Sequence, residues 1–447
     1  MLSLPAFRGE TAGMPNSSPR QAKPERASPR VFENVVNPFC GTLCDDLVVE
    51  RSEAGLKVVK NGSSQSIAGF ERKLPPASPS VNGNDVDLSA AIKEAARLIG
   101  KAKLPLFGGL ATDVAGMRAV LALAERSGGI VDHALSEAQY RNFKILQSTG
   151  WMMTTLTETR NRADLIIIAG SDIHRLHPRF FERIVSPPDS MFDVAAPKRT
   201  VVFIGKGLDR SGAKGSRIGE VVTLACKDEE AGHAVALLRA RMRGFKVAPP
   251  KRRGGVSLAE IDALAERCRK AKYGVVVWAP PSLNFPHAEL AVEQFTGLVK
   301  DLNQTTRFAG LALGGAEGAI TAAAVCTWIS GYPLRVSYAC GAPDYDPYRW
   351  DIGRMLKDGE GDLLVWIASI SPSLVPPPVK VPTIVLGTPG LALTTTPSVF
   401  IPVGTPGLDH SGRLIRVDNV VTLPLKDLGR ADLPPAAEML SAIQAAL

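Results

Sequence analysis

The sequence predicts an α/β fold of two doubly wound domains behind a small β-rich segment. Short apolar runs that end in turn residues alternate with amphipathic stretches of helical period, as in buried parallel strands joined by helices. This alternation begins near residue 76 and pauses once, at the Pro-, Gly- and Arg-rich stretch 246–256. Hydrophobic residues make up 45% of the 447 positions and charged residues 21%, which allows a large packed core.

The chain before residue 76 has a different character. Residues 1–30 are rich in Pro, Ser and Arg with few large apolar residues, and we expect a flexible tail. Residues 31–75 contain short β-type pieces, at 46–50 and 56–60, which predict a small β-rich unit.

We expect the first α/β domain at 76–253, the second at 254–390 and a loop-rich segment with a short helix at 391–447. Helices are predicted at 87–102, 112–129, 229–245, 257–271, 288–303 and 436–447. Strands are predicted at 104–110, 163–172, 199–205, 220–225, 273–280, 362–369 and 381–387.

Composition restricts the class of function. The net charge of +8 and a pI near 9.2 are compatible with nucleic acid, an anionic surface or acidic partners. Aromatic residues are only 6%, without aromatic–basic interleaving, which argues against nucleic acid. No apolar run reaches the roughly 18 residues of a membrane span, and the N-terminus has no signal pattern, so we expect a cytoplasmic protein without a membrane segment.

Isolated cysteines in apolar or helical surroundings fit the same compartment. We predict buried structural thiols at Cys226, Cys268, Cys326 and Cys340, as in a reducing compartment.

Two strand-to-glycine turns, LFGGLATD at 106–113 and IIIAGSD at 166–172, would let a backbone approach a phosphate. Neither matches a dinucleotide or Walker motif, and such turns also arise from packing alone. His174 and His177 have a metal-like spacing but no third ligand nearby, so we expect a surface loop with satisfied imidazoles. Residues 409–411 read Asp-His-Ser, but contiguity is no argument for a hydrolase triad.

A basic strip closes the first domain. Its seven cationic residues admit two interpretations, a solvated helix end and loop, or an electropositive surface for an acidic partner or polyanionic ligand. They are Arg239, Arg241, Arg243, Lys246, Lys251, Arg252 and Arg253.

The stretch NPFCGTLCDD at 37–46 has the form of an iron–sulfur loop. Such loops hold a cluster through a tight C-x2-C-x3-C run and a later fourth Cys. Cys40 and Cys44 supply the second interval, while Asn37 stands where the first Cys would be.

These residues carry a family resemblance. NPFCGTLCDDLVVE resembles the CPFCGTLCDD opening of the B subunit of formylmethanofuran dehydrogenases, which are molybdopterin-dependent oxidoreductases. Residues 157–179, 327–347 and 410–426 resemble later segments of the same polypeptide in the same order. The resemblance covers most of the chain after residue 31 and implies a molybdopterin-oxidoreductase-like fold.

Carrying the family's ligands onto this sequence indicates that they have been lost. The cluster positions fall on Asn37, Cys40, Cys44 and Ser66, so two of four thiolates are absent. The metal-binding Cys–His pair falls, by spacing, on Ala138 and Gln139.

The resemblance therefore implies no catalytic residue, no metal and no iron–sulfur or pterin cofactor in this chain. We expect Trp151, Met152 and Met153 to help close the former pterin cavity.

A branch of the family without redox chemistry is the bacterial formyltransferase/hydrolase complex, and the resemblance implies its degenerate B subunit. The expected role is to scaffold hydrolase and transferase sister subunits and a further small subunit, with zinc in the hydrolase. The basic strip could guide a polyglutamyl methanofuran-type carrier. The alternatives are an active tungsten or molybdenum formylmethanofuran dehydrogenase catalytic subunit, and an independent phosphate- or nucleotide-binding protein.

Overall fold

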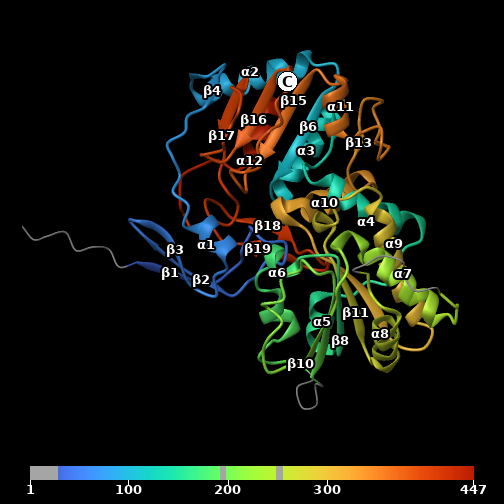
Figure 1. Cartoon of the computed structure of the whole chain (residues 1–447). Coiled ribbons are helices and arrows are strands. Elements are labelled where there is room, and N and C mark those ends of the chain that lie inside the picture. The colour runs from blue at the N-terminus through green and yellow to red at the C-terminus, as the bar shows by residue number, and fades with distance from the viewer. Residues whose placement is uncertain (1–28, 192–197, 248–254) are drawn as a thin grey trace, which may run out of the picture.

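The computed structural model describes residues 29–191, 198–247 and 255–447 (Figure 1). The predicted tail therefore lies almost entirely outside the described residues, as do Lys251, Arg252 and Arg253 of the basic strip. Among the described residues, no helix is long and apolar enough to cross a membrane.

The N-terminal segment forms the β-rich unit that its alternating pieces predict. Three antiparallel strands make its sheet, β1 (Arg30–Val35), β2 (Leu47–Ser52) and β3 (Gly55–Lys60). The helix α1 (Ser64–Phe70), which the sequence did not predict, follows β3. This unit projects to one side of the molecule (Figure 1).

A nine-stranded sheet forms the upper part of the molecule in Figure 1. Its parallel centre has the order β7-β6-β15-β16-β17, which is the 2-1-3-4-5 order of a doubly wound sheet. Antiparallel pairs extend both edges, β13 and β14 beyond β7, and β4 and β5 beyond β17. The strands are β4 (Ser80–Val81), β5 (Asn84–Asp85), β6 (Pro105–Ala111), β7 (Ile130–Val131), β13 (Val336–Ser337), β14 (Asp344–Tyr345), β15 (Leu363–Ala368), β16 (Thr383–Gly387) and β17 (Val399–Pro402).

A five-stranded, fully parallel sheet forms the lower part. Its order, β10-β9-β8-β11-β12, is the 3-2-1-4-5 order of a doubly wound sheet. The strands are β8 (Leu165–Ala169), β9 (Arg199–Ile204), β10 (Ile218–Leu224), β11 (Gly274–Trp278) and β12 (Phe308–Ala312).

The two sheets do not divide the chain in the way we expected. We placed separate domains at 76–253 and 254–390, but each sheet takes strands from both ranges. The chain builds β4 to β7, leaves to build the whole five-stranded sheet, and returns with β13 to complete the nine-stranded one. The physical reason is that a buried parallel strand is apolar along its whole length, so its sequence does not identify its neighbours.

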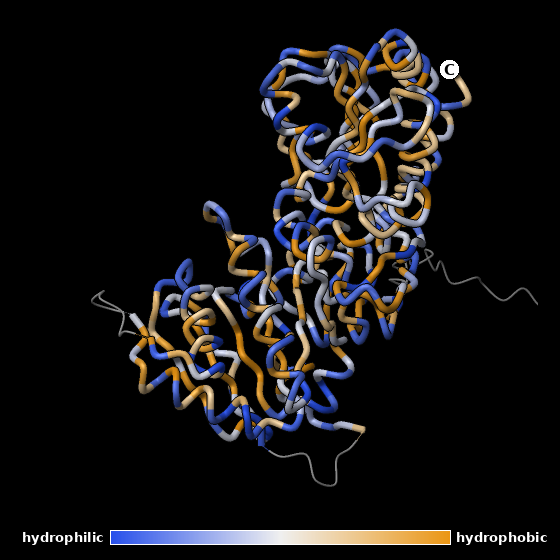
Figure 2. The backbone as a smooth tube through the Cα atoms, turned by 90° about the vertical axis from the view of Figure 1, so that its right-hand side faces the viewer, coloured by the Kyte–Doolittle hydropathy of each residue, from blue (hydrophilic) through white to orange (hydrophobic). Residues whose placement is uncertain are grey.

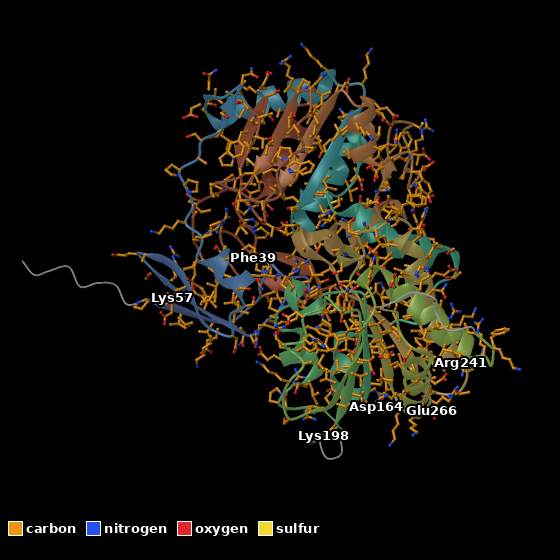
Figure 3. The ribbon with its side chains drawn as sticks, in the orientation of Figure 1. Phe39, Lys57, Asp164, Lys198, Arg241 and Glu266 are labelled. Atoms are coloured by element: carbon orange, nitrogen blue, oxygen red, sulfur yellow. The ribbon has the colours of Figure 1, made fainter. Side chains whose placement is uncertain are left out.

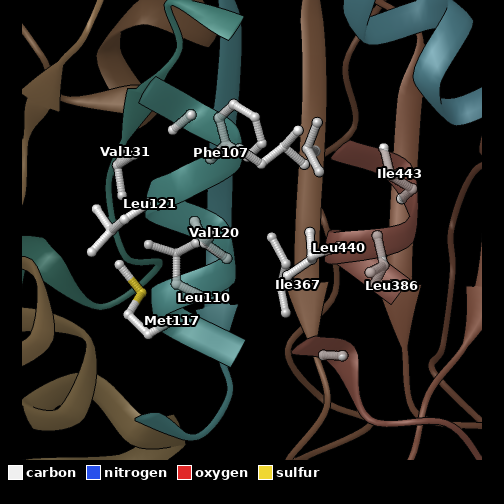
Figure 4. Close-up of a cluster of buried hydrophobic side chains, with 14 of the residues drawn as sticks. Phe107, Leu110, Met117, Val120, Leu121, Val131, Ile367, Leu386, Leu440 and Ile443 are labelled. Atoms are coloured by element: carbon white, nitrogen blue, oxygen red, sulfur yellow. The ribbon is translucent and has the colours of Figure 1, made fainter. Parts of the chain in front are cut away.

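Helices cover both faces of both sheets, and each face is a separate hydrophobic core. The nine-stranded sheet packs one face on α2 (Leu88–Lys101), α3 (Val114–Ser127), α10 (Ala319–Ser330) and α12 (Ala436–Ala445), and the other on α11 (Ile352–Asp358) and loops. Figure 4 shows the first of these cores, in which Met117 and Val120 of α3 lie on one side and Leu440 and Ile443 of α12 on another.

The five-stranded sheet lies between α7 (Ala231–Met242), α8 (Leu258–Lys270) and α9 (Ala288–Leu302) on one face, and α5 (Leu156–Arg162), α6 (Ile173–Leu176) and the short helix η1 (Phe181–Val185) on the other. Figure 2 shows hydrophobic segments running through the interior of both parts, with hydrophilic segments in the outer loops. A two-stranded sheet, β18 (Gly412–Ile415) with β19 (Thr422–Leu425), completes the C-terminal segment.

Candidate functional site

A cavity of about 500 Å³ lies where the two large sheets and the N-terminal segment meet. We call it the central cavity. One wall is built by α4 (Ser136–Ser148) and α10, which connect the two sheets. The loops that follow β11 and β12 form another wall, and the loop of residues 39–41 closes the N-terminal side. The cavity therefore lies at the carboxyl ends of two parallel strands, where doubly wound folds bind ligands.

The lining of the central cavity carries no formal charge at its walls. None of its described lining residues is an Asp, Glu, Lys or Arg. Aromatic, sulfur-containing and small apolar residues supply most of the surface, including Phe39, Phe143, Met153 and the alanines of α10. Such a surface favours neutral, apolar molecules over ions.

The structure brings three of the four expected cluster positions together in one tight loop. The backbone N–H of Asn37 donates to the carbonyl oxygen of Cys44 at 2.8 Å, and the Asn37 side-chain oxygen accepts from the N–H of Phe39. The Thr42 hydroxyl lies between the two sulfurs, 3.1 Å from Cys40 Sγ and 3.7 Å from Cys44 Sγ. Asn37, Cys40 and Cys44 are all buried.

Ser66, the fourth position, has another role. It is the third residue of α1, where its hydroxyl accepts a hydrogen bond from the backbone N–H of Ser63 at 2.7 Å and donates to the Ser63 carbonyl. Ser63 in turn accepts from the N–H of Ser66, which completes a capping box. The hydroxyl at this position therefore stabilises a helix start.

Our expectation for His177 was wrong. The side chain is buried, lines the central cavity, and its Nδ1 lies 3.5 Å from Cys40 Sγ. Burial raises the pKa of the Cys40 thiol to about 11 and lowers the pKa of the His177 imidazole to about 4. Both groups are therefore neutral near pH 7, so the pair lacks the thiolate that a nucleophilic cysteine needs. His174 does lie nearer the surface, with its Nε2 4.0 Å from Asp209.

The residues at the expected metal-ligand positions, Ala138 and Gln139, both line the central cavity from the first turn of α4. Ala138 presents a methyl group, which cannot bind a metal. Gln139 is 8% exposed, and neither its Oε1 nor its Nε2 has a hydrogen-bond partner. A buried amide without hydrogen-bond partners is unfavourable in free energy, which distinguishes Gln139 from the other residues that line the cavity.

Trp151, Met152 and Met153 do not fill the central cavity. Trp151 packs edge-on against Trp278, with ring centroids 5.7 Å apart, and lines one side together with Met153. Met152 and Met153 are each about half exposed, at 52% and 53%. Trp151 and Met153 narrow the cavity, whereas Met152 does not line it, and a space of about 500 Å³ remains.

Packing explains both strand-to-glycine turns. A Cβ atom at Gly109, where φ is +74°, would lie 2.5 Å from the carbonyl oxygen of Ile367 on the neighbouring strand. At Gly170, where φ is +57°, it would lie 2.8 Å from the carbonyl oxygen of Asp228. The buried Ser171 hydroxyl accepts from the N–H of Ala279, which joins the ends of β8 and β11 at the point where the strand order reverses. These observations favour the interpretation without a phosphate.

Ion pairs within the chain engage much of the described basic strip. Arg239 and Arg243 both bind Asp301, and Arg241 binds Asp262 through two bonds of 2.9 Å. Arg241 lies on the outer surface of the five-stranded part, on the opposite side from Phe39 at the cavity (Figure 3). The described arginines of the strip thus stabilise α7 against α8 and α9.

The two acids that end the NPFCGTLCDD stretch fix this loop to the five-stranded part. Asp46 accepts two hydrogen bonds from Arg179, at 2.6 and 2.9 Å, and one from Arg183 at 2.8 Å. Asp45 accepts one from Arg183. Arg179 also binds Glu182. This Asp–Arg network holds the loop that carries Cys40 at the edge of the central cavity. The sequence did not predict the network, because charged residues alone do not indicate which partners they will pair with.

The other candidates are structural. Asp409 pairs with Arg430 and accepts from the N–H of Thr405, while the His410 ring contacts backbone carbonyls, so no triad forms. All six cysteines are free thiols, five of them buried, but Cys340 is exposed, which corrects our prediction for that residue.

The donor set differs from that of a four-iron cluster or a thiolate-bound metal. Such a cluster needs four thiolates, and here the four expected positions carry two thiols, an amide at Asn37 and, at Ser66, a hydroxyl that is bonded within the capping box. Within the described ranges, no group of three or more His, Cys, Asp and Glu side chains is arranged to hold a metal ion.

Comparison with known proteins supports the family resemblance. No family model matches the chain. The B subunit of tungsten-containing formylmethanofuran dehydrogenase 2 from Methanococcus maripaludis is 27% identical over 405 residues, which cover 87% of this chain and 92% of that protein. The protein of the same name from Methanocaldococcus jannaschii is 28% identical over 407 residues, covering 88% and 92%.

Two further relatives belong to another complex. The B subunit of the formyltransferase/hydrolase complex Fhc from Methylorubrum extorquens is 30% identical over 338 residues, which cover 75% of this chain and 87% of that protein. A chain in the crystal structure of the formyltransferase/hydrolase complex of that organism with methylofuran superposes with a TM-score of 0.68 at 28% identity, covering 82% of this chain and 98% of that one. This confirms the resemblance that the sequence motifs predicted. The chain therefore belongs to the family of B subunits found in formylmethanofuran dehydrogenases and in the formyltransferase/hydrolase complex.

Proposed function

We propose that this chain is a non-redox structural subunit of a formyltransferase/hydrolase complex. In that complex, formyl-tetrahydromethanopterin is converted to formate via formylmethanofuran. The chain holds hydrolase and transferase subunits, and a further small subunit, in a fixed relation so that a carrier can visit both. It uses a molybdopterin-oxidoreductase-like fold as the scaffold, and its six free thiols suit the cytoplasm.

One observation carries the proposal. The positions at which a redox relative would bind its metal and part of its cluster carry no thiolate or imidazole, because Ala138 ends in a methyl group, Gln139 offers only a neutral carboxamide, and the Ser66 hydroxyl is bonded in the capping box. Meanwhile the fold is complete, with both doubly wound sheets intact. A fold that is retained without the ligands for a redox cofactor is what we expect of a subunit with a structural role. The similarity to the Fhc B subunit supports the same conclusion.

The alternative is an active tungsten or molybdenum formylmethanofuran dehydrogenase catalytic subunit. The observation in its favour is that two relatives named as tungsten-containing match 87% and 88% of this chain. Under this alternative, Cys40, Cys44 and His177 would have to support metal chemistry with unusual ligands.

Metal analysis of the native assembly separates the two. The chain is purified through an affinity tag together with the subunits that accompany it, and its tungsten, molybdenum and iron contents are measured beside mass spectrometry of the partners. We expect formyltransferase and hydrolase subunits, zinc from the hydrolase, and no stoichiometric tungsten, molybdenum or iron. One tungsten or molybdenum atom, or about four iron atoms, per chain would establish the alternative.

The basic strip enters the proposal in a limited way. Since Arg239, Arg241 and Arg243 pair within the chain, guidance of a polyglutamyl carrier falls to Lys246 and to residues 251–253. Charge reversal at Arg252 and Arg253 should slow formate production or weaken assembly, because either an anionic carrier or an acidic partner surface would then be repelled. If formate production and assembly both stayed at wild-type levels in this variant, the basic strip would have no role in guiding a carrier or binding a partner.

A further inference from the structure

Another cavity, of about 710 Å³, lies on the face of the nine-stranded sheet that α11 and loops cover. We propose that this acidic pocket binds an aliphatic polyamine, with Asp132 holding one ammonium group at the inner end and Glu137 another at the mouth. It shares no lining residue with the central cavity. The argument concerns the chain's own residues and does not depend on which complex the chain joins.

The described lining of the acidic pocket carries more negative than positive charge. Its carboxyl groups belong to Asp132, Glu137 and Asp351, and its one cation is Arg335. His133 also lines it, but burial lowers the pKa of this imidazole to about 4, so it is neutral near pH 7. The whole chain has a net charge of +8, so this local excess of acids does not follow from the composition. Such a pocket repels phosphates and carboxylates and attracts cations.

Arg335 does not satisfy the carboxyl group of Asp132. Its Nη2 lies 2.6 Å from Asp351 Oδ2 and 3.1 Å from Glu137 Oε2, whereas its Nε stays 3.5 Å from Asp132 Oδ2 and makes no hydrogen bond. Asp132 Oδ2 accepts a long bond of 3.4 Å from the N–H of Ile352.

The other oxygen of this carboxyl group, Asp132 Oδ1, has no hydrogen-bond partner among the described residues, although the residue is only 4% exposed. Buried polar atoms of this kind are normally hydrogen-bonded. An ammonium group at Oδ1 supplies both the missing donor and a compensating charge.

The remaining walls favour a linear alkyl body. Leu356, Trp366 and Leu374 line the pocket beside the acids. Asp132 is buried, whereas 68% of the Glu137 side chain is exposed, so the two carboxyl groups lie at different depths. Methylene groups pack along apolar side chains while their terminal ammonium groups meet acids, as in a lysine side chain. A polyamine has this pattern of charged ends and an apolar middle.

A metal ion fits this pocket less well than an organic cation. The three carboxyl groups flank a guanidinium group, which repels a metal. Within the described part of the chain, no group of three or more His, Cys, Asp and Glu side chains is arranged to hold a metal ion.

Protonation of Asp132 is the competing way to remove its charge, and it gives the binding a pH dependence. Burial raises the pKa of Asp132 to about 7. Of the other groups near it, Arg335 stays cationic, and burial raises the pKa values of Tyr140 and Cys326, so both stay neutral. Alkylamines stay protonated up to about pH 9. A diamine should therefore bind about tenfold more tightly at pH 8 than at pH 6, since ionised Asp132 accepts the ammonium group.

The test uses the full chain with the subunits that co-purify with it, and cadaverine, an aliphatic diamine, as the probe in calorimetry. Pentylamine has the same carbon chain with one ammonium group, and pentanediol has none. We expect saturable binding of cadaverine, binding of pentylamine at least about tenfold weaker, and binding of pentanediol weaker still, because each lost charge removes a charge-assisted hydrogen bond.

The variant Asp132→Asn keeps the shape of the side chain and removes its charge. It should weaken cadaverine binding about tenfold or more at pH 8 and abolish the pH dependence. The control Asp358→Asn lies at the exposed end of α11, outside the pocket, and should bind as the wild type does. Thermal unfolding verifies that both variants fold.

Glu137→Gln provides a second variant whose folding is not in question, since this side chain is largely exposed. It should lower the affinity for cadaverine toward that for pentylamine. Absence of saturable binding, equal binding of pentanediol, or unchanged binding in folded Asp132→Asn and Glu137→Gln chains would overturn the proposal.

Discussion

The Asp–Arg network that fixes the NPFCGTLCDD loop allows a quantitative prediction for Asp46→Ala. The wild-type carboxylate accepts three charge-assisted hydrogen bonds, two from Arg179 and one from Arg183. Each is worth about 1.5–3 kcal/mol when sheltered from water. Asp46 is 34% exposed, so solvent screening reduces this sum, and Arg179 keeps its bonds to Glu182. We expect a loss of about 2 kcal/mol in the docking of this loop.

Hydrogen exchange followed by mass spectrometry reads this loss locally. Peptides that cover residues 37–60 should exchange about 30-fold faster in Asp46→Ala, because each 1.36 kcal/mol corresponds to a tenfold change in the opening equilibrium. Asp45→Ala is the matched control, since Asp45 is half exposed and accepts a single bond from Arg183. It should change exchange by about twofold at most. Equal effects of the two variants, or none in Asp46→Ala, would refute the reasoning.

The same network has a pH signature. Burial raises the pKa of Asp46, but the Arg179 hydrogen bond and the charges of Arg183 and Arg179 outweigh it and hold the pKa below its usual value. A carboxyl group with a lowered folded-state pKa stabilises the fold above its unfolded-state pKa of about 3.9, and this contribution disappears as the pH falls through the folded-state value. The difference between wild type and Asp46→Ala should therefore be full at pH 7 and vanish under strongly acidic conditions.

Two further changes test other parts of the structure. Ser66→Ala removes the side-chain half of the capping box, the bond from the Ser63 N–H to the Ser66 hydroxyl, and should destabilise α1 by about 1 kcal/mol. The measurement is proteolysis at this helix, which should become faster, while Ser64→Ala on the exposed side should not change it; equal cleavage of the two variants would contradict the assigned role. Burial raises the pKa of Asp132 to about 7 against the opposing charge of Arg335. The free energy of unfolding of the wild type should therefore fall by about 2 kcal/mol between pH 5 and 7. The variant Asp132→Asn, which cannot ionise, should lack this decline when thermal unfolding is measured across the same pH range. Parallel pH profiles of the two proteins would show that Asp132 does not cause the decline.

Most strands and surface helices could be predicted from the sequence because their signals are local. The buried runs that became β6, β8, β11 and β15 are continuously apolar, and those of β9 and β16 are apolar after their first one or two residues. The helices α2, α3, α8 and α9 carry an apolar stripe of helical period. The helices α4 and α10 were missed. The sequence of α4 is mostly polar with little regular stripe, and α10 is apolar on nearly all sides, so neither shows the pattern of an amphipathic helix.

The candidate site could be predicted only where its residues are close in sequence. Asn37, Cys40 and Cys44 meet because they share one loop. The contact of His177 with Cys40 joins residues 137 positions apart, and no local pattern announces it. Asp46 and Arg179 likewise lie far apart in the sequence, and no local pattern predicts that they pair. Long-range partners of this kind depend on the order of strands in the sheets, which the apolar sequences of those strands leave open.

The topology explains why the central cavity lies at the expected metal-ligand positions. The five-stranded sheet is inserted between β7 and β13, so the chain crosses between the sheets twice, once through α4 and once through α10 (Figure 1). Both crossing helices line the cavity, and Ala138 and Gln139 lie in the first turn after the first crossing begins. Each sheet is covered by its own hydrophobic cores, to which these two side chains do not belong. A substitution at Ala138 or Gln139 therefore leaves both sets of cores unchanged, so the fold tolerates a change in the chemistry of the cavity between its two halves.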